Sequence, residues 1–144
     1  MKIVNFEGTN LYVNSLIPFP GYIAMMFFGF IFYQKNCESY LSDPNKKGRI
    51  RTMVNHENIH LEQIKDFGTL FKWCKPLQIL IGGIFFYIIY LFEWIIRLFI
   101  NGPLKAYKNI SFEKEAYENE LDYEYIQKKR KLFNQWRKER TRKD

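Results

Sequence analysis

The chain has 144 residues, enough for one domain with a single modest core. Aromatic residues make up 19% of it, which argues against intrinsic disorder, and two cysteines are too few for a disulfide framework. The net charge is +7, and the whole excess lies in residues 126–144, which hold nine Lys and Arg against two acidic residues. Residues 1–125 carry no net charge, so the chain is not a uniformly basic binding protein.

The N-terminal part, residues 1–48, is expected to contain a short β element and loops. It does not have the pattern of a signal peptide, because Lys2 is the sole charge of any n-region and no small-residue cleavage site follows. Residues 22–33 are rich in aromatic residues and isoleucine, which favours one or two buried strands. Residues 34–48 are polar and are expected to form a turn or loop.

Residues 49–68 have the spacing of an amphipathic helix, and they contain the HExxH motif His56-Glu57-Asn58-Ile59-His60. Residues four apart lie on one helix face, so both imidazoles can bind one metal ion. Glu57 is then placed to take a proton from an attacking water. These are the chain's two histidines, and a chance arrangement of this kind has a probability on the order of 0.1%. The motif therefore predicts a metal site on this helix.

Two histidines do not complete a catalytic zinc site, which has three protein ligands and one open position. The chain has no third histidine, and Cys37 and Cys74 lie outside the helical reach of the motif. We therefore expect a carboxylate from a later helix, and the candidates are Glu113, Glu115 and Glu118.

Residues 77–100 are the most apolar segment, and we expect them to contact a membrane. The fourteen residues 79–92 carry no charge, fewer than the ~20 that a spanning helix needs, but counting through Glu93 and Arg97 gives 24 residues. Since the histidines precede this segment and the candidate carboxylates follow it, their helices must meet around it. The segment is therefore expected to lie along the membrane interface, to re-enter as a hairpin near Gly82, to pack on the protein, or to span partly beside an intramembrane site.

The last segment, residues 109–144, is expected to form a long helix from about Ser111 to Arg140, capped by Ser111 or Asn109. Its basic tail favours an anchor on an anionic membrane surface, which the positive-inside tendency assigns to the cytoplasmic face. Nucleic-acid binding is not expected, because the tail aromatics Phe133 and Trp136 lie on an apolar stripe rather than alternating with the charges.

HExxH followed by Glu113-Lys114-Glu115-Ala116 resembles the gluzincins, especially the small integral-membrane proteases of the prenyl-protein and heat-shock types. The resemblance implies that Glu113 is the third ligand, with Glu115 or Glu118 taking that place if the register differs. Tyr117 stands where those families have an Asp that orients a ligating histidine. Its hydroxyl would take over that role or polarise the substrate carbonyl.

Four stretches also look like a family of small uncharacterised bacterial and phage proteins, a resemblance that brings no known substrate. These stretches are residues 17–22, 28–32, 55–63 and 110–117.

The sequence thus predicts a single zincin-like domain over residues 1–144, α+β and mostly helical. Its expected function is that of a membrane-associated zinc metallopeptidase. It would hold Zn²⁺ with His56, His60 and Glu113 and cleave a peptide or protein substrate with Glu57 as general base and Tyr117 as a further catalytic group. The alternative is a non-catalytic protein that binds or perturbs membranes and keeps a vestigial or structural metal site.

Overall fold

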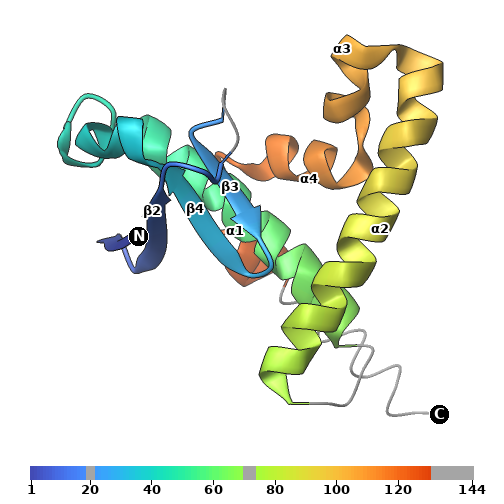
Figure 1. Cartoon of the computed structure of the whole chain (residues 1–144), viewed down its shortest axis with the longest axis horizontal. Helices are drawn as coiled ribbons and strands as arrows, with labels where there is room; N and C mark the ends of the chain where they lie inside the picture. Colours follow the sequence, from blue (N-terminus) through green and yellow to red (C-terminus); the bar gives the residue numbers. More distant parts are fainter. Residues whose placement is uncertain (19–21, 70–73, 131–144) are drawn as a thin grey trace.

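The computed structural model of the chain describes residues 1–18, 22–69 and 74–130. It is α+β and mostly helical, with a four-stranded sheet at the N-terminus followed by helices (Figure 1). The fold class expected from the sequence is therefore confirmed. Phe133, Trp136 and the greater part of the basic tail lie outside the described residues.

Two hairpins joined side by side make the sheet. Their turns, Glu7-Gly8 and Phe28-Gly29, have two residues each, all at positive φ, as two-residue hairpin turns with the twist of the flanking strands require. β2 pairs with β4 in parallel, so the strand order is β1-β2-β4-β3 and β3 lies at an edge. The strands are β1 (Lys2–Phe6), β2 (Thr9–Asn14), β3 (Ala24–Phe27) and β4 (Phe30–Gln34). The strands expected within residues 22–33 are thus confirmed.

One face of the sheet contributes buried side chains to the core that it shares with α1 (Lys47–Gly68), the helix expected over residues 49–68. Alternate residues of each strand point to the same face, so Leu11 and Val13 of β2 and Ile31 and Tyr33 of β4 are buried together. Between β4 and α1, where a polar loop was expected, the chain forms the short 3₁₀ helix η1 (Lys35–Ser42).

The apolar segment forms one continuous helix, α2 (Lys75–Asn101), so the expectation of a hairpin near Gly82 is wrong. Gly82 lies where α2 crosses α1, and a Cβ atom there would come within 2.3 Å of the carbonyl oxygen of Ile64 and 2.7 Å of the amide nitrogen of Gly68. The two glycines therefore bring the helix backbones together instead of turning the chain. Of the four arrangements expected for residues 77–100, packing on the protein is confirmed for the part of α2 that crosses α1.

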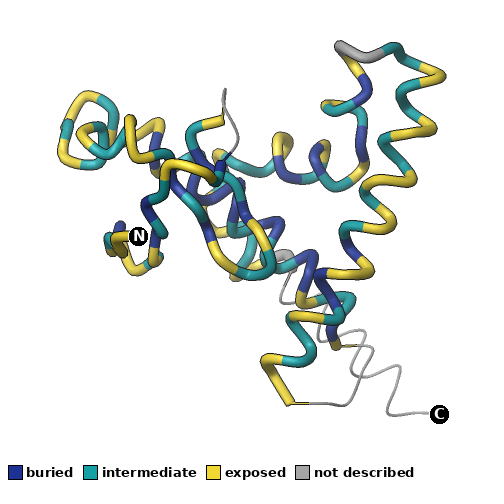
Figure 2. Tube along the Cα trace, viewed as in Figure 1, coloured by how far each residue is buried: buried dark blue, intermediate teal, exposed yellow. Residues whose placement is uncertain are grey.

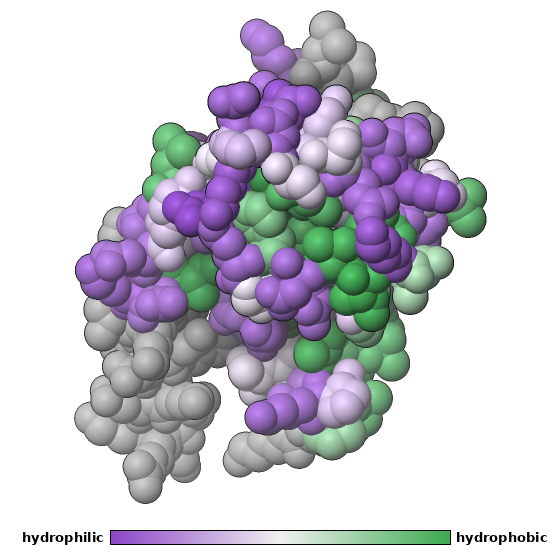
Figure 3. Space-filling view, turned by 90° about the vertical axis from the view of Figure 1, so that its left-hand side faces the viewer, coloured by the Kyte–Doolittle hydropathy of each residue, from purple (hydrophilic) through white to green (hydrophobic). Residues whose placement is uncertain are grey.

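Beyond the crossing, α2 extends away from the sheet with most of its side chains exposed or half-buried (Figures 1 and 2). Among the described residues it is the one helix long and apolar enough to cross a membrane, and 17% of its most apolar window is buried. The opposite face of the molecule is largely hydrophilic, with apolar side chains gathered near its middle (Figure 3). The large exposed apolar side chains of α2 are Leu80, Ile84, Phe85, Ile88, Ile89, Leu91, Phe92, Ile95, Ile96, Phe99 and Ile100.

After α2 the chain turns back toward α1 through α3 (Pro103–Ala106) and η2 (Tyr107–Asn109) and forms α4 (Ser111–Asn119). Neither Ser111 nor Asn109 caps α4. The N-cap residue is Ile110, and no side chain forms a capping hydrogen bond at this end of the helix. Glu93 of α2 accepts hydrogen bonds from the backbone N–H and the hydroxyl of Ser111 instead, at 3.0 and 2.5 Å. Glu93 also forms an ion pair with Arg97, one turn later on α2. Through its hydrogen bonds to Ser111, Glu93 connects α2 to the start of α4.

The long helix expected from Ser111 to Arg140 is wrong for the described residues, because α4 ends at Asn119. Turns follow, and then a short helical segment, η3 (Ile126–Arg130). The physical cause lies on α1, where the Asn55 amide donates to the carbonyl oxygens of Asn119, Glu120 and Asp122, at 3.4, 2.9 and 3.3 Å. These carbonyls are therefore satisfied by another helix rather than by a further turn of α4.

Candidate metal centre

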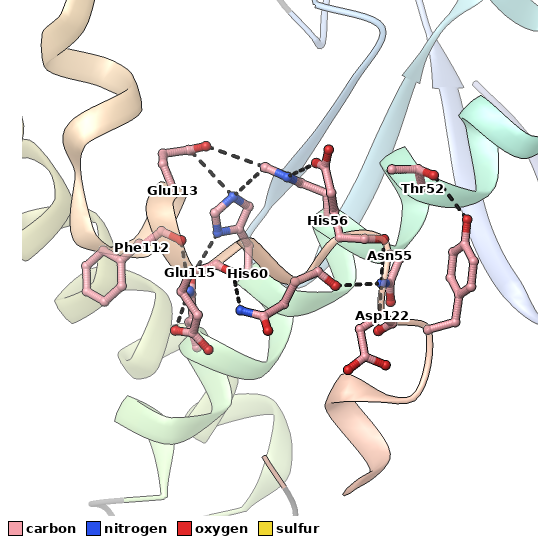
Figure 4. Close-up of polar contacts among 12 residues, drawn as sticks. Thr52, Asn55, His56, His60, Phe112, Glu113, Glu115 and Asp122 are labelled. Carbon is pink, nitrogen blue, oxygen red and sulfur yellow. Dashed lines mark hydrogen bonds and ion pairs between the residues drawn. The ribbon is translucent and has the colours of Figure 1, made fainter. Parts of the chain in front are cut away.

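Two helices that are distant in the sequence bring the predicted ligand residues together. His56 and His60 lie on one face of α1, and Glu113 reaches them from the first turn of α4 (Figure 4). All three side chains are buried, with exposed fractions of 7%, 6% and 3%. Burying three polar groups in one place is costly unless they are paired or hold an ion, so the cluster calls for a physical explanation.

The three side chains are spaced as ligands of one metal ion would be. The two Nε2 atoms are 3.2 Å apart. Nε2 of His56 is 3.4 Å from one oxygen of Glu113, and Nε2 of His60 is 3.4 Å from the other. Ligand atoms that each lie about 2.0–2.1 Å from a tetrahedral zinc ion are about 3.3 Å from one another. The donor set and its spacing therefore fit zinc.

The opposite ring nitrogen of each histidine is already engaged. Nδ1 of His56 is 2.9 Å from a carboxylate oxygen of Glu120, which accepts hydrogen bonds only, so this Nδ1 carries a proton. Nδ1 of His60 is 2.8 Å from Oε1 of Gln63. The Gln63 amide nitrogen donates to the Phe112 carbonyl and to Glu115, at 3.1 and 2.9 Å, and this fixes Oε1 as the atom that faces His60.

Because both Nδ1 atoms donate, both Nε2 atoms of the neutral imidazoles present lone pairs. These lone pairs converge with the carboxylate of Glu113, so three electron-rich groups face one another in a buried space. Such an arrangement is unfavourable unless a proton or a metal cation lies among them. Hydrogen-bonded Nδ1 atoms with Nε2 directed at the ion are also the usual arrangement of metal-bound histidines.

Glu113 is held in place from α2 and carries an unsatisfied oxygen. The Tyr90 hydroxyl donates to Oε1 at 2.8 Å, whereas Oε2 is buried and has no hydrogen-bond partner among the described residues. Burial alone would raise the pKa of Glu113. In the absence of a metal, hydrogen bonds from the His56 and His60 ring nitrogens outweigh burial and lower the pKa to about 2. The Glu113 side chain is therefore a carboxylate at neutral pH.

The same contact acts on His60. Burial opposes the charged imidazolium, but the Glu113 carboxylate outweighs burial and raises the pKa of His60. Without a metal, a proton on this ring is the alternative partner of the carboxylate. Metal and protons therefore compete for one place.

Glu57 is buried beside the histidines and is anchored by the sheet. Its Oε2 accepts the backbone N–H of Met26, on the edge strand β3, at 2.7 Å. Burial raises the pKa of Glu57, opposed by His60, His56 and the Met26 N–H. A carboxylate whose pKa is raised toward neutrality is better matched to accepting and returning a proton.

Tyr117 lies against the site but does not orient a histidine. Its ring meets that of His56 edge-on, with centroids 4.7 Å apart, while Glu120 occupies Nδ1 of that histidine. The expectation that the Tyr117 hydroxyl takes over the role of the family's Asp is therefore not met; Glu120, three residues later, makes that contact. Burial raises the pKa of Tyr117, so its hydroxyl stays protonated and able to donate.

The other two candidate carboxylates lie away from the histidines. Glu115 accepts hydrogen bonds from Gln63 and from the Tyr125 hydroxyl, each at 2.9 Å. Glu118 is 62% exposed at its side chain and lies 3.8 Å from Lys114. The structure thus places Glu113 of the three against His56 and His60.

Sequence reasoning missed Glu120 and Tyr90. Nothing local marks Glu120, because it reaches His56 only where α4 ends, and that end depends on Asn55 of another helix. Tyr90 carries a weak signal, because its hydroxyl lies four residues after the buried Phe86 on a mostly apolar helix. Gln63 could be found, because it lies three residues after His60 on the same helix.

Comparisons with protein-family models, with curated proteins and with solved structures found no match. What the centre can do is therefore inferred from its own geometry and chemistry.

Proposed function

We propose that this protein is a membrane-associated zinc metallopeptidase, with His56, His60 and Glu113 as the ligands of the metal. The observation that carries the proposal is the convergence of two imidazole Nε2 atoms and one carboxylate at 3.2–3.4 Å, with both Nδ1 atoms already donating. Three protein ligands leave one position open, as in catalytic rather than structural zinc sites.

The side chains around the centre have complementary roles in hydrolysis. Zinc, when bound, supplies a Lewis acid that polarises the scissile carbonyl and activates a water molecule. Glu57 accepts the proton that this water loses and returns it to the nitrogen of the leaving amine, so that its own charge is restored at the end. Tyr117 keeps a protonated hydroxyl and donates to the oxygen on which negative charge develops.

Membrane association is supported by the exposed apolar side chains of α2 and by the charge of the tail. The apolar surface of this 27-residue helix is largely exposed, which favours contact with lipid over burial in the core of a water-soluble domain. The basic residues after position 125 then bind the anionic headgroups of the cytoplasmic leaflet.

The test is to measure zinc content and hydrolysis on the purified full chain in mild detergent, with fluorescently labelled casein as substrate. We expect one zinc per chain in the wild type and in Glu57→Gln, with hydrolysis lowered at least ~100-fold in that variant. His56→Ala should lose both zinc and activity. The matched control Glu118→Gln, an exposed carboxylate on α4, should change neither. Zinc-free wild type, or hydrolysis that survives Glu57→Gln, would contradict the proposal.

A non-catalytic membrane protein is the second candidate, and the exposed face of α2 favours it as much as it favours a membrane-bound peptidase. The two candidate functions differ in whether the activity of the protein depends on the histidines. Leakage of a dye from anionic liposomes that is undiminished in a variant lacking His56, Glu57 and His60 would support the second candidate.

A further inference from the structure

A cavity of about 380 Å³ lies next to the metal centre, between the edge strand β3 and helix α2. Glu57, His60 and Glu113 contribute to its wall, so whatever enters it comes into contact with the groups that would act on a peptide bond. The rest of the wall is mostly apolar, and the apolar side comprises Met25, Met26, Phe27, Phe86 and Tyr87.

The cavity walls are held by contacts between α2 and the edge strand. The Tyr87 hydroxyl donates to the carbonyl oxygen of Met26 at 3.0 Å. The Tyr87 ring packs on those of Phe27 and Phe86, with centroids 5.7 and 5.2 Å apart. Phe86 in turn packs against His60 at 6.0 Å. These aromatic contacts preform the space before a ligand arrives.

The charge of the cavity narrows the choice of ligand. Its carboxylates, Glu57 and Glu113, are both negative when ionised, and the described wall contains no lysine or arginine. An acidic side chain would lose its hydration in this mostly apolar space and would find no lysine or arginine on the described wall to pair with. A bulky apolar side chain would gain contact with the aromatic and methionine walls and would lose no hydrogen bonds.

The second cavity at the centre is different. It has a volume of about 440 Å³, and its wall includes Arg49, Thr52 and Glu120. It shares four residues with the first cavity, which are Tyr22, Ala24, Glu57 and Tyr107. The two cavities therefore adjoin at Glu57, and the second has the more polar wall of the two. A polypeptide that passes the centre would have different environments on the two sides of the cleaved bond.

We infer that the apolar cavity is the specificity pocket of the proposed peptidase, and that it selects polypeptides with a bulky apolar or aromatic side chain next to the cleaved bond. This inference rests on the proposed function, because the cavity is defined by its contact with Glu57 and His60. It adds a substrate class, which neither the motif nor the ligand set specifies.

The first test is cleavage of a peptide series that differs at one residue: Phe, Leu, Ala, Lys or Asp. With the zinc-loaded full chain in detergent, we expect kcat/KM for the Phe and Leu peptides to exceed that for Ala by on the order of ten- to hundredfold. The Asp peptide should be the poorest. Mass spectrometry should place the cut beside the varied residue. Equal rates across the series, or a preference for Asp, would overturn the pocket and leave the peptidase standing.

A variant sharpens this test. Met25 is half-buried on the cavity wall, so Met25→Lys introduces a cation there. We expect this variant to cleave the Phe peptide less well and the Asp peptide better, while Met25→Leu keeps the wild-type order. The matched control is Ile3→Lys, the same type of change on an exposed strand residue outside the cavity wall, and it should leave the order unchanged. An unchanged order in Met25→Lys would contradict the assignment.

If no peptide is cleaved, the proposed function fails. The pocket is then tested by a binding measurement that needs no catalysis. A peptide that carries the photoreactive apolar residue benzoylphenylalanine is irradiated with the protein, and the attachment sites are mapped by mass spectrometry. Attachment to the walls formed by β3 and α2 would support an apolar-side-chain site. Attachment confined to the outer face of α2, or spread over the chain, would overturn it.

Discussion

At the scale of single residues, the centre is set up before any ligand is present. His56 and His60 each have one ring nitrogen fixed by a hydrogen bond, one to Glu120 and one to Gln63. The other nitrogen of each ring is thereby directed at Glu113. Histidines whose tautomer and ring orientation are already fixed bind a metal more tightly, because their side chains lose less conformational freedom when the metal binds.

Glu120 is therefore predicted to be a positioning residue. Glu120→Ala removes the acceptor of the His56 Nδ1 proton and should weaken zinc binding by about 10–100-fold, measured by competition with a chromogenic chelator. Glu118→Ala, which removes an exposed carboxylate from the same helix, is the control and should bind zinc as the wild type does. Equal zinc affinities for the two variants would show that the hydrogen bond at Nδ1 has no role in the site.

Glu7 gives a pH dependence that is independent of the metal centre. Arg51 binds its carboxylate with two hydrogen bonds of 2.6 Å and, together with Lys47, lowers the pKa of Glu7 from 4.5 to about 2. A lowered folded-state pKa contributes stability above the unfolded value and loses it as the pH falls. The Tm of the wild type should therefore exceed that of Glu7→Gln at pH 6, and the difference should shrink as the pH falls from 4.5 toward 2. A difference that stays constant down to pH 2.5 would count against this ion pair.

At the scale of the elements, the crossing of α1 and α2 determines where Glu113, the third candidate ligand, lies. Gly82 and Gly68 bring the two helix backbones close together, and α2 then leads through α3 and η2 to α4. Glu93 fastens α4 to α2 at one end, and Asn55 fastens it to α1 at the other. The position of Glu113 thus depends on contacts at both ends of its helix.

The crossing predicts opposite effects for two Gly→Ala substitutions. Gly82→Ala should destabilise the protein by about 1–3 kcal/mol, because the new Cβ would overlap the backbone of α1. Gly48→Ala, in the first turn of α1, meets nothing within 4 Å and should be neutral or stabilising by up to about 1 kcal/mol. Denaturant unfolding in detergent micelles measures both. A Gly82→Ala variant as stable as Gly48→Ala would mean that the helices do not cross at this point.

The elements also show what a sequence can and cannot predict. The motif helix and its histidine face depend on residues four apart, so local spacing was enough to find them. Residues far apart in the sequence determine the rest. Asn55 donates a hydrogen bond to the carbonyl oxygen of Glu120, 65 positions later, where α4 ends. The end of α4 places the Glu120 carboxylate beside His56, and the expected long helix is therefore wrong. Gly82 suggested a hairpin because its backbone freedom is visible in the sequence, whereas the partner helix that it contacts is not.

At the scale of the whole molecule, the proposed metal centre and the proposed membrane attachment occupy different parts of the chain. The centre lies where α1, α4 and the edge of the sheet meet, while the upper part of α2 lies away from the sheet (Figure 1). Many of the large apolar side chains of α2 are exposed. Because His60 and Glu113 contact the same space, they cannot lie on opposite sides of a bilayer. Any contact of α2 with lipid must therefore leave His60, which precedes α2, and Glu113, which follows it, on the same side of the bilayer or together within it.

If the metal centre and the membrane attachment are separate, removal of the basic tail should weaken membrane binding and leave zinc binding unchanged. A chain that ends at Arg130 lacks six of the nine basic residues of the tail. Its binding to vesicles containing phosphatidylserine should weaken, since each basic residue near such a surface contributes about 1 kcal/mol. Binding to purely zwitterionic vesicles, and zinc content, should stay unchanged, as vesicle sedimentation and metal analysis would show. Equal binding of both chains to anionic vesicles would contradict an electrostatic anchor.

The central claim is that His56, His60 and Glu113 hold one zinc ion, and anomalous X-ray scattering from crystals at the zinc absorption edge tests it most directly. We predict a single strong peak about 2 Å from Nε2 of His56, Nε2 of His60 and the carboxylate of Glu113. A peak beside Glu115 or Glu118, or no peak at all in crystals grown with zinc, would contradict it.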